Sequence, residues 1–316
     1  MAEQELEFPL VWDSTMRGAF ASCPKKLWWE FMRRLGPSTT SVHLHFGACA
    51  ARGFEVCRYE FYYNKVSQTI AEARGLRALM EEWGEYESPV DSAKTFEHCV
   101  AAFADYFTSY PLATDHIQPY MREDGKPAVE FSFAAPIPEV LHPVTNEPLI
   151  YAGRFDMLGV YNDTLFVIDE KTTQQLGNSW FRQWDLRAQF SGYCWAARQH
   201  GLPVAGAIVR GIAIRKNGGI DFAEAISHRP DYLIDRWRKQ LASDLQRAVD
   251  CYKAGYWDYN FDAACASYGG CQYKSLCERE DPEPWIEGYF VERVWNPLHK
   301  DPLDENADVQ AVTNAF

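Results

Sequence analysis

The stretch Gly153–Thr173, with the sequence GRFDMLGVYNDTLFVIDEKTT, decides the fold class. Two mostly apolar runs flank the pair Asn162-Asp163. Because Asn and Asp adopt left-handed turn conformations readily, this pair favours a tight connection between two antiparallel strands. The upstream run PAVEFSFAAPI also alternates in the manner of a strand. The sequence therefore predicts a β-meander near the middle of the chain.

The two strands of this hairpin carry acidic residues. Asp156 lies in the first run, and the second run ends in Asp169, Glu170 and Lys171. Since successive side chains alternate faces, we expect Asp169 and Lys171 on one face of the sheet and Glu170 on the other. Converging carboxylates repel each other unless a cation lies between them, and Mg²⁺ or Mn²⁺ prefers such oxygen ligands. A metal-dependent catalytic edge and a surface hairpin with an ion pair both fit this pattern.

The remaining chain reads as helical before the meander and mixed after it. This order predicts an α/β fold with a mixed central sheet flanked by helices. We expect one helix over 178–200, a strand hairpin across 217–219 and a long amphipathic helix from about 231. The predicted organisation is a single domain over 1–280, with a helical part at about 14–125, a sheet core at about 126–229, a long helix and cysteine loop at about 230–280, and a C-terminal extension at 281–316 anchored by Trp285 and Trp295.

The composition is that of an ordinary globular protein. The 316 residues are 47% hydrophobic and 24% charged, and no apolar run approaches the ~18 residues of a membrane span. The acidic start MAEQELEFPL has no secretory pattern, which predicts a cytoplasmic protein of a bacterium or a phage-infected cell. Its nine cysteines are then thiols or metal ligands rather than disulfides. The net charge of −13 excludes a uniformly basic surface but not a local basic groove.

The hairpin resembles the core of the PD-(D/E)XK nuclease superfamily, whose pattern is G-x-x-D, a turn, and an apolar strand ending in D-x-K-T. The resemblance implies a restriction-endonuclease-like fold and a metal-dependent nuclease. It also implies that Asp156 and Asp169 bind Mg²⁺ or Mn²⁺, that Glu170 adds its backbone carbonyl, and that Lys171 is the catalytic lysine. The bound metal ion would activate a water for phosphodiester hydrolysis.

A second motif, QFSGYCWAAR, follows 18 residues after Lys171. Gln189 and Tyr193 are four residues apart, so they share one face of a helix. Such spacing is common in amphipathic helices. A Q-x-x-x-Y helix after the D-x-K strand also resembles the RecB-like branch of the superfamily, which implies that both residues contact the DNA backbone.

Cysteines near both ends of the chain form a third pattern. Cys265, Cys271 and Cys277 are each six residues apart in a glycine-containing loop, and Cys23 precedes a basic-aromatic run. This arrangement resembles the RecB-like nucleases in which one N-terminal and three C-terminal cysteines hold a 4Fe-4S cluster, among them CRISPR-associated and helicase-linked exonucleases. The spacing differs from the usual triplet, and a Cys₄ zinc site is the alternative. Either metal site would join the N- and C-terminal segments.

One position departs from the family. The N-terminal helix motif G-x-x-x-H-x-x-x-E matches at Gly47 and Glu55, but Ala51 replaces the histidine. In many relatives this histidine helps to bind the metal, and alanine has no ligand atom. Glu55 and Glu130 are candidate sources of further oxygen ligands. Ala51 favours the alternative of a nuclease-fold protein that binds DNA or assembles complexes with weakened or lost cleavage.

The basic-aromatic run near the N-terminus is a candidate DNA contact. Lys25 and Lys26 with Trp28 and Trp29 would bind phosphates and stack on bases, or would form an ordinary amphipathic helix. The resemblance implies an exonuclease acting on DNA ends or single strands. It further implies a role, with protein partners, in recombination, repair or CRISPR-type and phage DNA processing.

Overall fold

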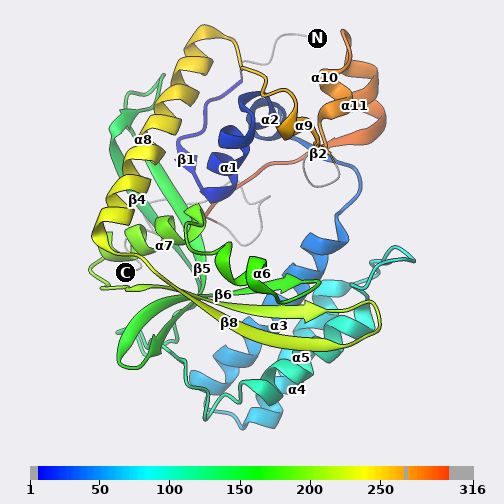
Figure 1. The fold of residues 1–316 in the computed structure, drawn as a ribbon, viewed down its shortest axis with the longest axis vertical. Coiled ribbons are helices and arrows are strands. Elements are labelled where there is room, and N and C mark those ends of the chain that lie inside the picture. The colour runs from blue at the N-terminus through cyan, green and yellow to red at the C-terminus, as the bar shows by residue number, and fades with distance from the viewer. Residues whose placement is uncertain (1–5, 267–269, 299–316) are drawn as a thin grey trace. The chain divides into compact units, whose positions relative to one another are not determined.

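The computed structural model describes residues 6–266 and 270–298, which fall into two compact units (Figure 1). One unit comprises the described parts of 1–39, 132–154 and 235–316, and the other comprises 40–131 and 155–234. The strands β4 (Val129–Leu141) and β5 (Pro148–Tyr161) contribute residues to both. The single domain over 1–280 stays a prediction.

The second unit is built on the predicted meander. β5 pairs antiparallel with β6 (Thr164–Thr173), β6 pairs parallel with β7 (Gly206–Ile214), and β7 pairs antiparallel with β8 (Ile220–His228). The turn between β5 and β6 has positive φ angles at Asn162 and Asp163, 47° and 57°. The central sheet is thus mixed, as expected. A short strand, β3 (Gln118–Pro119), also pairs antiparallel with β5.

Helices cover both faces of this sheet (Figure 1). Three long helices pack on one face, and their core includes the apolar side chains of Ile212 and Ile214 from β7. On the other face, Gly211 of β7 lies against Trp180. The bounds are α3 (Val42–Tyr62), α4 (Gln68–Trp83) and α5 (Phe96–Ser109) for the first face, and α6 (Asn178–Arg182) and α7 (Ala188–Gln199) for the second.

The prediction of a single helix over 178–200 is wrong, because the structure has two helices there, α6 and α7, with a break between them. The guanidinium of buried Arg229 donates hydrogen bonds to the carbonyl oxygens of Trp184 at 2.7 Å and Arg187 at 3.4 Å. Between the two helices the backbone turns, and the N–H of Arg187 donates to the same Trp184 carbonyl oxygen at 3.2 Å. The turn is thus bound by a residue some forty positions away, which the local pattern does not reveal. The helix does end at the predicted place, where Gly201 has a φ of 77°.

The first unit is organised around the long helix α8 (Asp231–Ala254), most of which lies in it. β1 (Val11–Trp12) pairs parallel with the start of β5, and α1 (Ser14–Ser22) follows it. Arg17 of α1 forms an ion pair with Asp244 of α8 at 2.8 Å. Aromatic contacts complete this core, with Tyr151 of β5 lying 5.2 Å from Trp237 between ring centroids.

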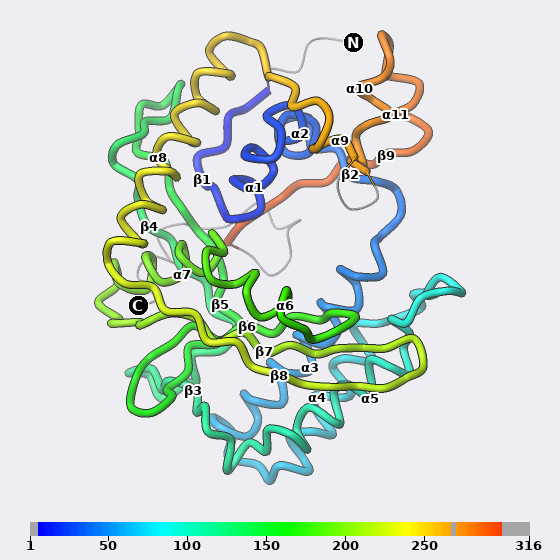
Figure 2. Tube along the Cα trace, in the orientation of Figure 1, coloured from blue at the N-terminus to red at the C-terminus, as the bar shows by residue number. Residues whose placement is uncertain are grey.

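The C-terminal extension is more regular than expected. Figure 2 shows the trace of this region, where β2 (Leu35–Pro37) pairs antiparallel with β9 (Phe290–Glu292). Both predicted anchors make contacts: Trp285 packs in an apolar cluster, and Trp295 Nε1 donates a hydrogen bond to Asp13 at 3.0 Å. The rest of the extension, 299–316, lies outside the described residues. The short helices of the first unit that remain to be named are α2 (Pro24–Leu27), the π-helix η1 (Trp28–Met32), α9 (Ala263–Ala266), α10 (Lys274–Cys277) and α11 (Glu283–Tyr289).

Among the residues that the structure describes, none of the helices has the length and apolar character needed to cross a membrane.

Candidate active site

The acidic residues of β5 and β6 meet at one place in the sheet. Met157 pairs with Ile168, so Asp156 and Asp169 are the next residues along the two antiparallel strands. The backbone N–H of Glu170 donates to Asp156 Oδ2 at 3.3 Å, which ties the Asp156 carboxylate to β6. The structure thus brings together the two acids that the sequence singled out.

Lys171 lies on the same side as Asp169. Its Nζ is 2.5 Å from Asp169 Oδ2, whereas Asp169 Oδ1 is buried without a hydrogen-bonding partner among the described residues. Asp169 is 0% exposed, while the side chain of Lys171 is 32% exposed. The side chain of Lys171 is therefore partly exposed, although its ammonium group contacts a buried carboxylate.

The electrostatics of this cluster favour an added positive charge. Burial raises the pKa of Asp156 well above its usual value, and the negative charge of Asp169 raises it further. Burial also raises the pKa of Asp169, with Lys171 opposing the shift. For Lys171, burial would lower the pKa, but the two carboxylates more than offset it and the pKa is raised. When both acids are ionised, the two carboxylates and one lysine leave one negative charge in excess, which a divalent cation would offset.

The donor set also fits such a cation. No group of three or more His, Cys, Asp or Glu side chains is arranged to hold a metal in residues 6–266 and 270–298. Mg²⁺ characteristically keeps several waters and binds through only one or two carboxylates. Asp156 and Asp169 match that pattern, with the buried Oδ1 of Asp169 as the orphaned ligand atom.

Glu170 points to the opposite face, as the sequence predicts. Its carboxylate forms a buried ion pair with Arg58 of α3 and accepts a hydrogen bond from the hydroxyl of Tyr106 of α5 at 2.8 Å. Sequence reasoning missed both partners. The available signal was an arginine four residues after Phe54, at a position that shares the otherwise apolar buried face of α3.

The helical layer beside the acids holds further polar residues. Gln189 Nε2 donates to the hydroxyl of Tyr193 at 3.1 Å, so the two predicted residues are hydrogen-bonded to each other. The ring centroid of Tyr193 lies 5.4 Å from that of Phe155. The exposed Arg187 was missed by sequence reasoning. Its charge acts on Asp169 and Lys171, and its guanidinium has no hydrogen bond or ion pair within the described part of the chain.

Comparison with known proteins shows the family of the chain. The sequence matches the model of the PD-(D/E)XK nuclease superfamily over residues 19–278. The chain belongs to the PD-(D/E)XK nuclease superfamily. No curated protein matches it.

Solved structures give remote matches to this superfamily member. A candidate exonuclease from Eubacterium rectale is similar with a TM-score of 0.45 at 12% identity, covering 81% of this chain and 87% of the other. The structure of SSO0001 is similar with a TM-score of 0.30 at 13% identity, covering 73% of this chain and 83% of the other.

The residues of the predicted N-terminal helix motif lie on α3. Gly47, Ala51 and Glu55 lie on successive turns of this helix. Glu55 forms an ion pair with Arg52 at 2.7 Å. Position 51 thus has no side-chain ligand atom, as the sequence showed.

The four predicted cysteines of this PD-(D/E)XK chain line one small pocket in the first unit. The backbone N–H of Asn260 donates to Cys23 Sγ at 3.4 Å, and Trp29 Nε1 donates to Cys277 Sγ at 3.4 Å. Burial raises the pKa of the Cys277 thiol. The thiols share a pocket, although within the described residues they are not arranged as a metal site. The other two cysteines on this pocket are Cys265 and Cys271.

Lys25 and Lys26 lie on α2 in the first unit, whereas the acids lie in the second. Lys25 Nζ is 3.4 Å from the ring centroid of Trp28, and burial lowers the pKa of Lys25 to about 8. Lys26 lines the cysteine pocket. Their predicted role in DNA binding stays a prediction.

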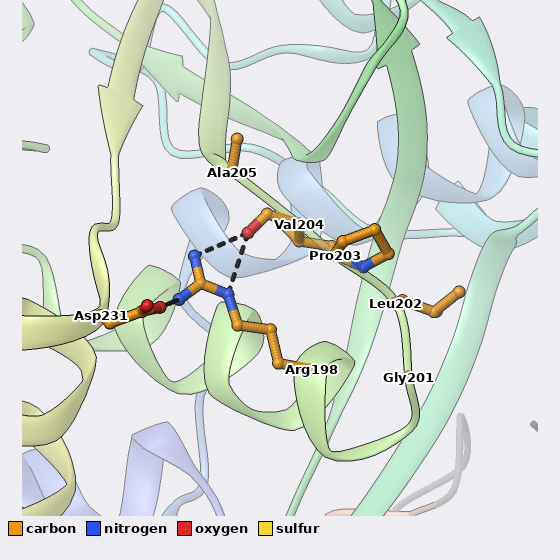
Figure 3. A pocket seen from close by; sticks show the side chains of 7 residues that line it. All are labelled: Arg198, Gly201, Leu202, Pro203, Val204, Ala205 and Asp231. Atoms are coloured by element: carbon orange, nitrogen blue, oxygen red, sulfur yellow. Dashed lines mark hydrogen bonds and ion pairs between the residues drawn. The ribbon is translucent and has the colours of Figure 1, made fainter.

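A separate groove is lined by Arg198 and the segment that follows α7 (Figure 3). The guanidinium of Arg198 donates to the carbonyl of Val204 at 2.7 Å and to that of Arg229 at 2.6 Å, and it pairs with Asp231 at 2.7 Å. Because the guanidinium already binds these three groups, the groove has the chemistry of a structural anchor.

Proposed function

We propose that this protein is a metal-dependent DNA nuclease that hydrolyses phosphodiester bonds. The observation that carries the proposal is the buried, partly unpartnered carboxylate of Asp169, which faces Asp156 and contacts Lys171. Membership of a nuclease superfamily supports it. The proposed substrates are DNA ends or single strands, in recombination, repair or CRISPR-type and phage DNA processing with protein partners.

In this proposal each residue of the acidic cluster on β5 and β6 has a separate role. Asp156, Asp169 and the backbone carbonyl of Glu170 hold Mg²⁺ or Mn²⁺. When bound, the metal would supply Lewis-acid chemistry, which would lower the pKa of a water and offset negative charge on the phosphate. Lys171 is held in place by Asp169, so that its ammonium group can orient that water or stabilise the charge that develops on the phosphate.

Substrate contacts are assigned to the helical layer beside the acids. Gln189 and Tyr193 contact the DNA backbone, with their mutual hydrogen bond fixing the orientation of both side chains. Arg187 adds an exposed guanidinium whose donors are available to a phosphate.

The test uses purified protein with labelled single-stranded and double-stranded linear DNA and circular DNA in the presence of Mn²⁺. We expect cleavage, and we expect Asp169→Ala and Lys171→Ala each to lower the rate by about 100-fold or more. Asp105→Asn, at an exposed position on α5, is the control and should cleave normally. Undiminished cleavage by both active-site variants would end the assignment. Degradation of linear but not circular DNA would establish the exonuclease mode.

We further propose that Cys23, Cys265, Cys271 and Cys277 hold a 4Fe-4S cluster, with zinc as the alternative. The shared pocket and the two N–H groups that donate to sulfur support this assignment, because hydrogen bonds to sulfur are typical of thiolate-bound iron. A brown anaerobic preparation containing iron and sulfide is the expected result. A colourless preparation with one zinc per chain would replace the cluster by a zinc site.

Ala51 supports one competing function, that of a nuclease-fold protein that binds DNA or assembles complexes without cleaving. DNA binding by the purified protein, with no cleavage in Mg²⁺ or Mn²⁺, would favour it. Ala51→His would then restore a side-chain ligand atom at position 51. Cleavage by this variant would show that the rest of the site is competent.

A further inference from the structure

The side of β6 that faces away from the proposed cation site is pinned by charged and polar groups. Glu170 is bound by Arg58 of α3, which also donates to the Tyr106 hydroxyl at 2.8 Å. That hydroxyl donates in turn to Glu170 Oε1 at 2.8 Å, which closes a triangle of side chains. Two residues further along β6, Thr172 Oγ1 accepts from Lys94 Nζ at 2.6 Å.

These groups are buried and continue into a larger network. Arg58 and Tyr106 are 4% and 1% exposed. Arg210 of β7, which is in register with Glu170, donates to the Tyr106 hydroxyl at 3.1 Å and makes two 2.7 Å hydrogen bonds to Asp115. A bidentate guanidinium fixes orientation as well as distance. The network therefore joins α3, α5, β6 and β7 into one rigid support.

The main-chain atoms of Glu170, unlike its side chain, are next to the groups of the proposed cation site. The N–H of Glu170 holds Asp156 Oδ2 at 3.3 Å, and its carbonyl is a proposed metal ligand. The neighbours Asp169 and Lys171 project from the opposite face to the Glu170 side chain, because strand residues alternate. Any rotation of the Glu170 peptide would move both of them.

We propose that Glu170 is a positioning residue, whose side chain is clamped by Arg58 and Tyr106 so that its peptide holds Asp156, Asp169 and Lys171 in place for the cation. This inference rests on the proposed metal-dependent function. When both are ionised, Asp156 and Asp169 repel each other before a cation binds, and that repulsion tends to separate β5 and β6 beside the Met157–Ile168 pair. The clamp opposes the separation from the far side of the sheet and keeps the cation site formed in the metal-free protein.

The test compares two tyrosine-to-phenylalanine substitutions in the same unit. Tyr106→Phe removes the hydroxyl that contacts Glu170 and Arg58. Tyr62→Phe removes a hydroxyl that donates to the Leu112 carbonyl at 2.6 Å, so it is a matched control for the loss of a structural hydrogen bond. Mn²⁺ affinity is measured without DNA, by electron paramagnetic resonance and calorimetry, together with the melting temperature.

We expect Tyr106→Phe to weaken Mn²⁺ binding by about tenfold, the scale seen when a partner behind a metal ligand is removed. Tyr62→Phe should remain within about twofold of the wild type at a comparable melting temperature. Should Tyr106→Phe fail to fold, Arg58→Lys takes its place, because it keeps the charge and loses the forked geometry. Equal Mn²⁺ affinity in the clamp variant and Tyr62→Phe overturns the inference.

Asp169→Asn separates this inference from the proposed function. If the wild type does not bind Mn²⁺, or if Asp169→Asn binds it equally well, the proposed cation site itself fails. If Asp169→Asn loses binding while the clamp variant does not, only the positioning role of Glu170 fails.

Discussion

The substitution Gly211→Ala tests how closely α6 packs beside Lys171. Gly211 is in register with Lys171 on the neighbouring strand. A Cβ atom added there would lie 2.4 Å from Cζ2 of Trp180 and 2.5 Å from Cδ2 of Leu176. Ordinary contacts of this kind begin near 3.4 Å, so the buried indole would have to retreat by about 1 Å.

The expected cost follows from this overlap. Forcing extra volume into a packed site costs about 1–3 kcal/mol, and alanine's lower chain entropy in the unfolded state returns less than about 1 kcal/mol of that. A net loss of about 2 kcal/mol corresponds to a fall in melting temperature of roughly 4–8 °C for a unit of this size.

The assay is thermal unfolding monitored by circular dichroism, with Gly47→Ala as the control of opposite sign. Gly47 lies inside α3, and no heavy atom lies within 4 Å of its added Cβ, so alanine should stabilise by about 0.5–1 kcal/mol. A Gly211→Ala protein that melts at the wild-type temperature or above would refute the packing argument, because Trp180 would then not press on that position.

Three further predictions concern charge and metal. Burial is the main cause that raises the pKa of Asp13 from 3.8 to about 6. The stability that protonation of Asp13 contributes is therefore complete below about pH 4 and is lost as the pH rises through 6. Asp13→Asn should remove up to about 3 kcal/mol of this pH dependence of the free energy of unfolding, measured in urea titrations. Arg187→Ala should weaken DNA binding and lower the slope of log binding constant against log salt concentration by about one. Arg182, which is exposed on α6, is the control, and Arg182→Ala should leave the affinity and the slope closer to wild type. Equal slopes for the two variants would remove Arg187 from the DNA interface. Cys277→Ser should lose bound metal and melt at a lower temperature, and Cys251→Ser should retain the metal; full metal content in both would exclude Cys277 as a ligand.

The hairpin that carries the acids could be predicted because its determinants are local. Asn162-Asp163 sets the turn, and the period of two along β6 sets which face each side chain takes. The placement of Asp169 with Lys171, and of Glu170 on the other face, follows from that period alone. A metal cluster held by four cysteines was predicted from resemblance and stays a prediction, although the four cysteines line one pocket.

Other features depend on residues distant in sequence. The turn between α6 and α7 is bound by Arg229, whose guanidinium donates to the carbonyl oxygens of Trp184 and Arg187. No pattern around Trp184 encodes that partner. The regular structure in the C-terminal extension likewise depends on pairing with Leu35–Pro37, more than 250 residues earlier.

The sequence by itself determined the superfamily motifs, the mixed sheet and the side of β6 on which the acids and the lysine lie, because alternation and turn chemistry act over a few residues. Only the tertiary structure decided that Asp169 is buried with an orphaned oxygen, that the charge of Arg187 acts on Asp169, and that Arg58 and Tyr106 bind Glu170. Burial and ion pairing depend on which helices cover each face of the sheet, and that choice is made by packing among residues far apart in the chain.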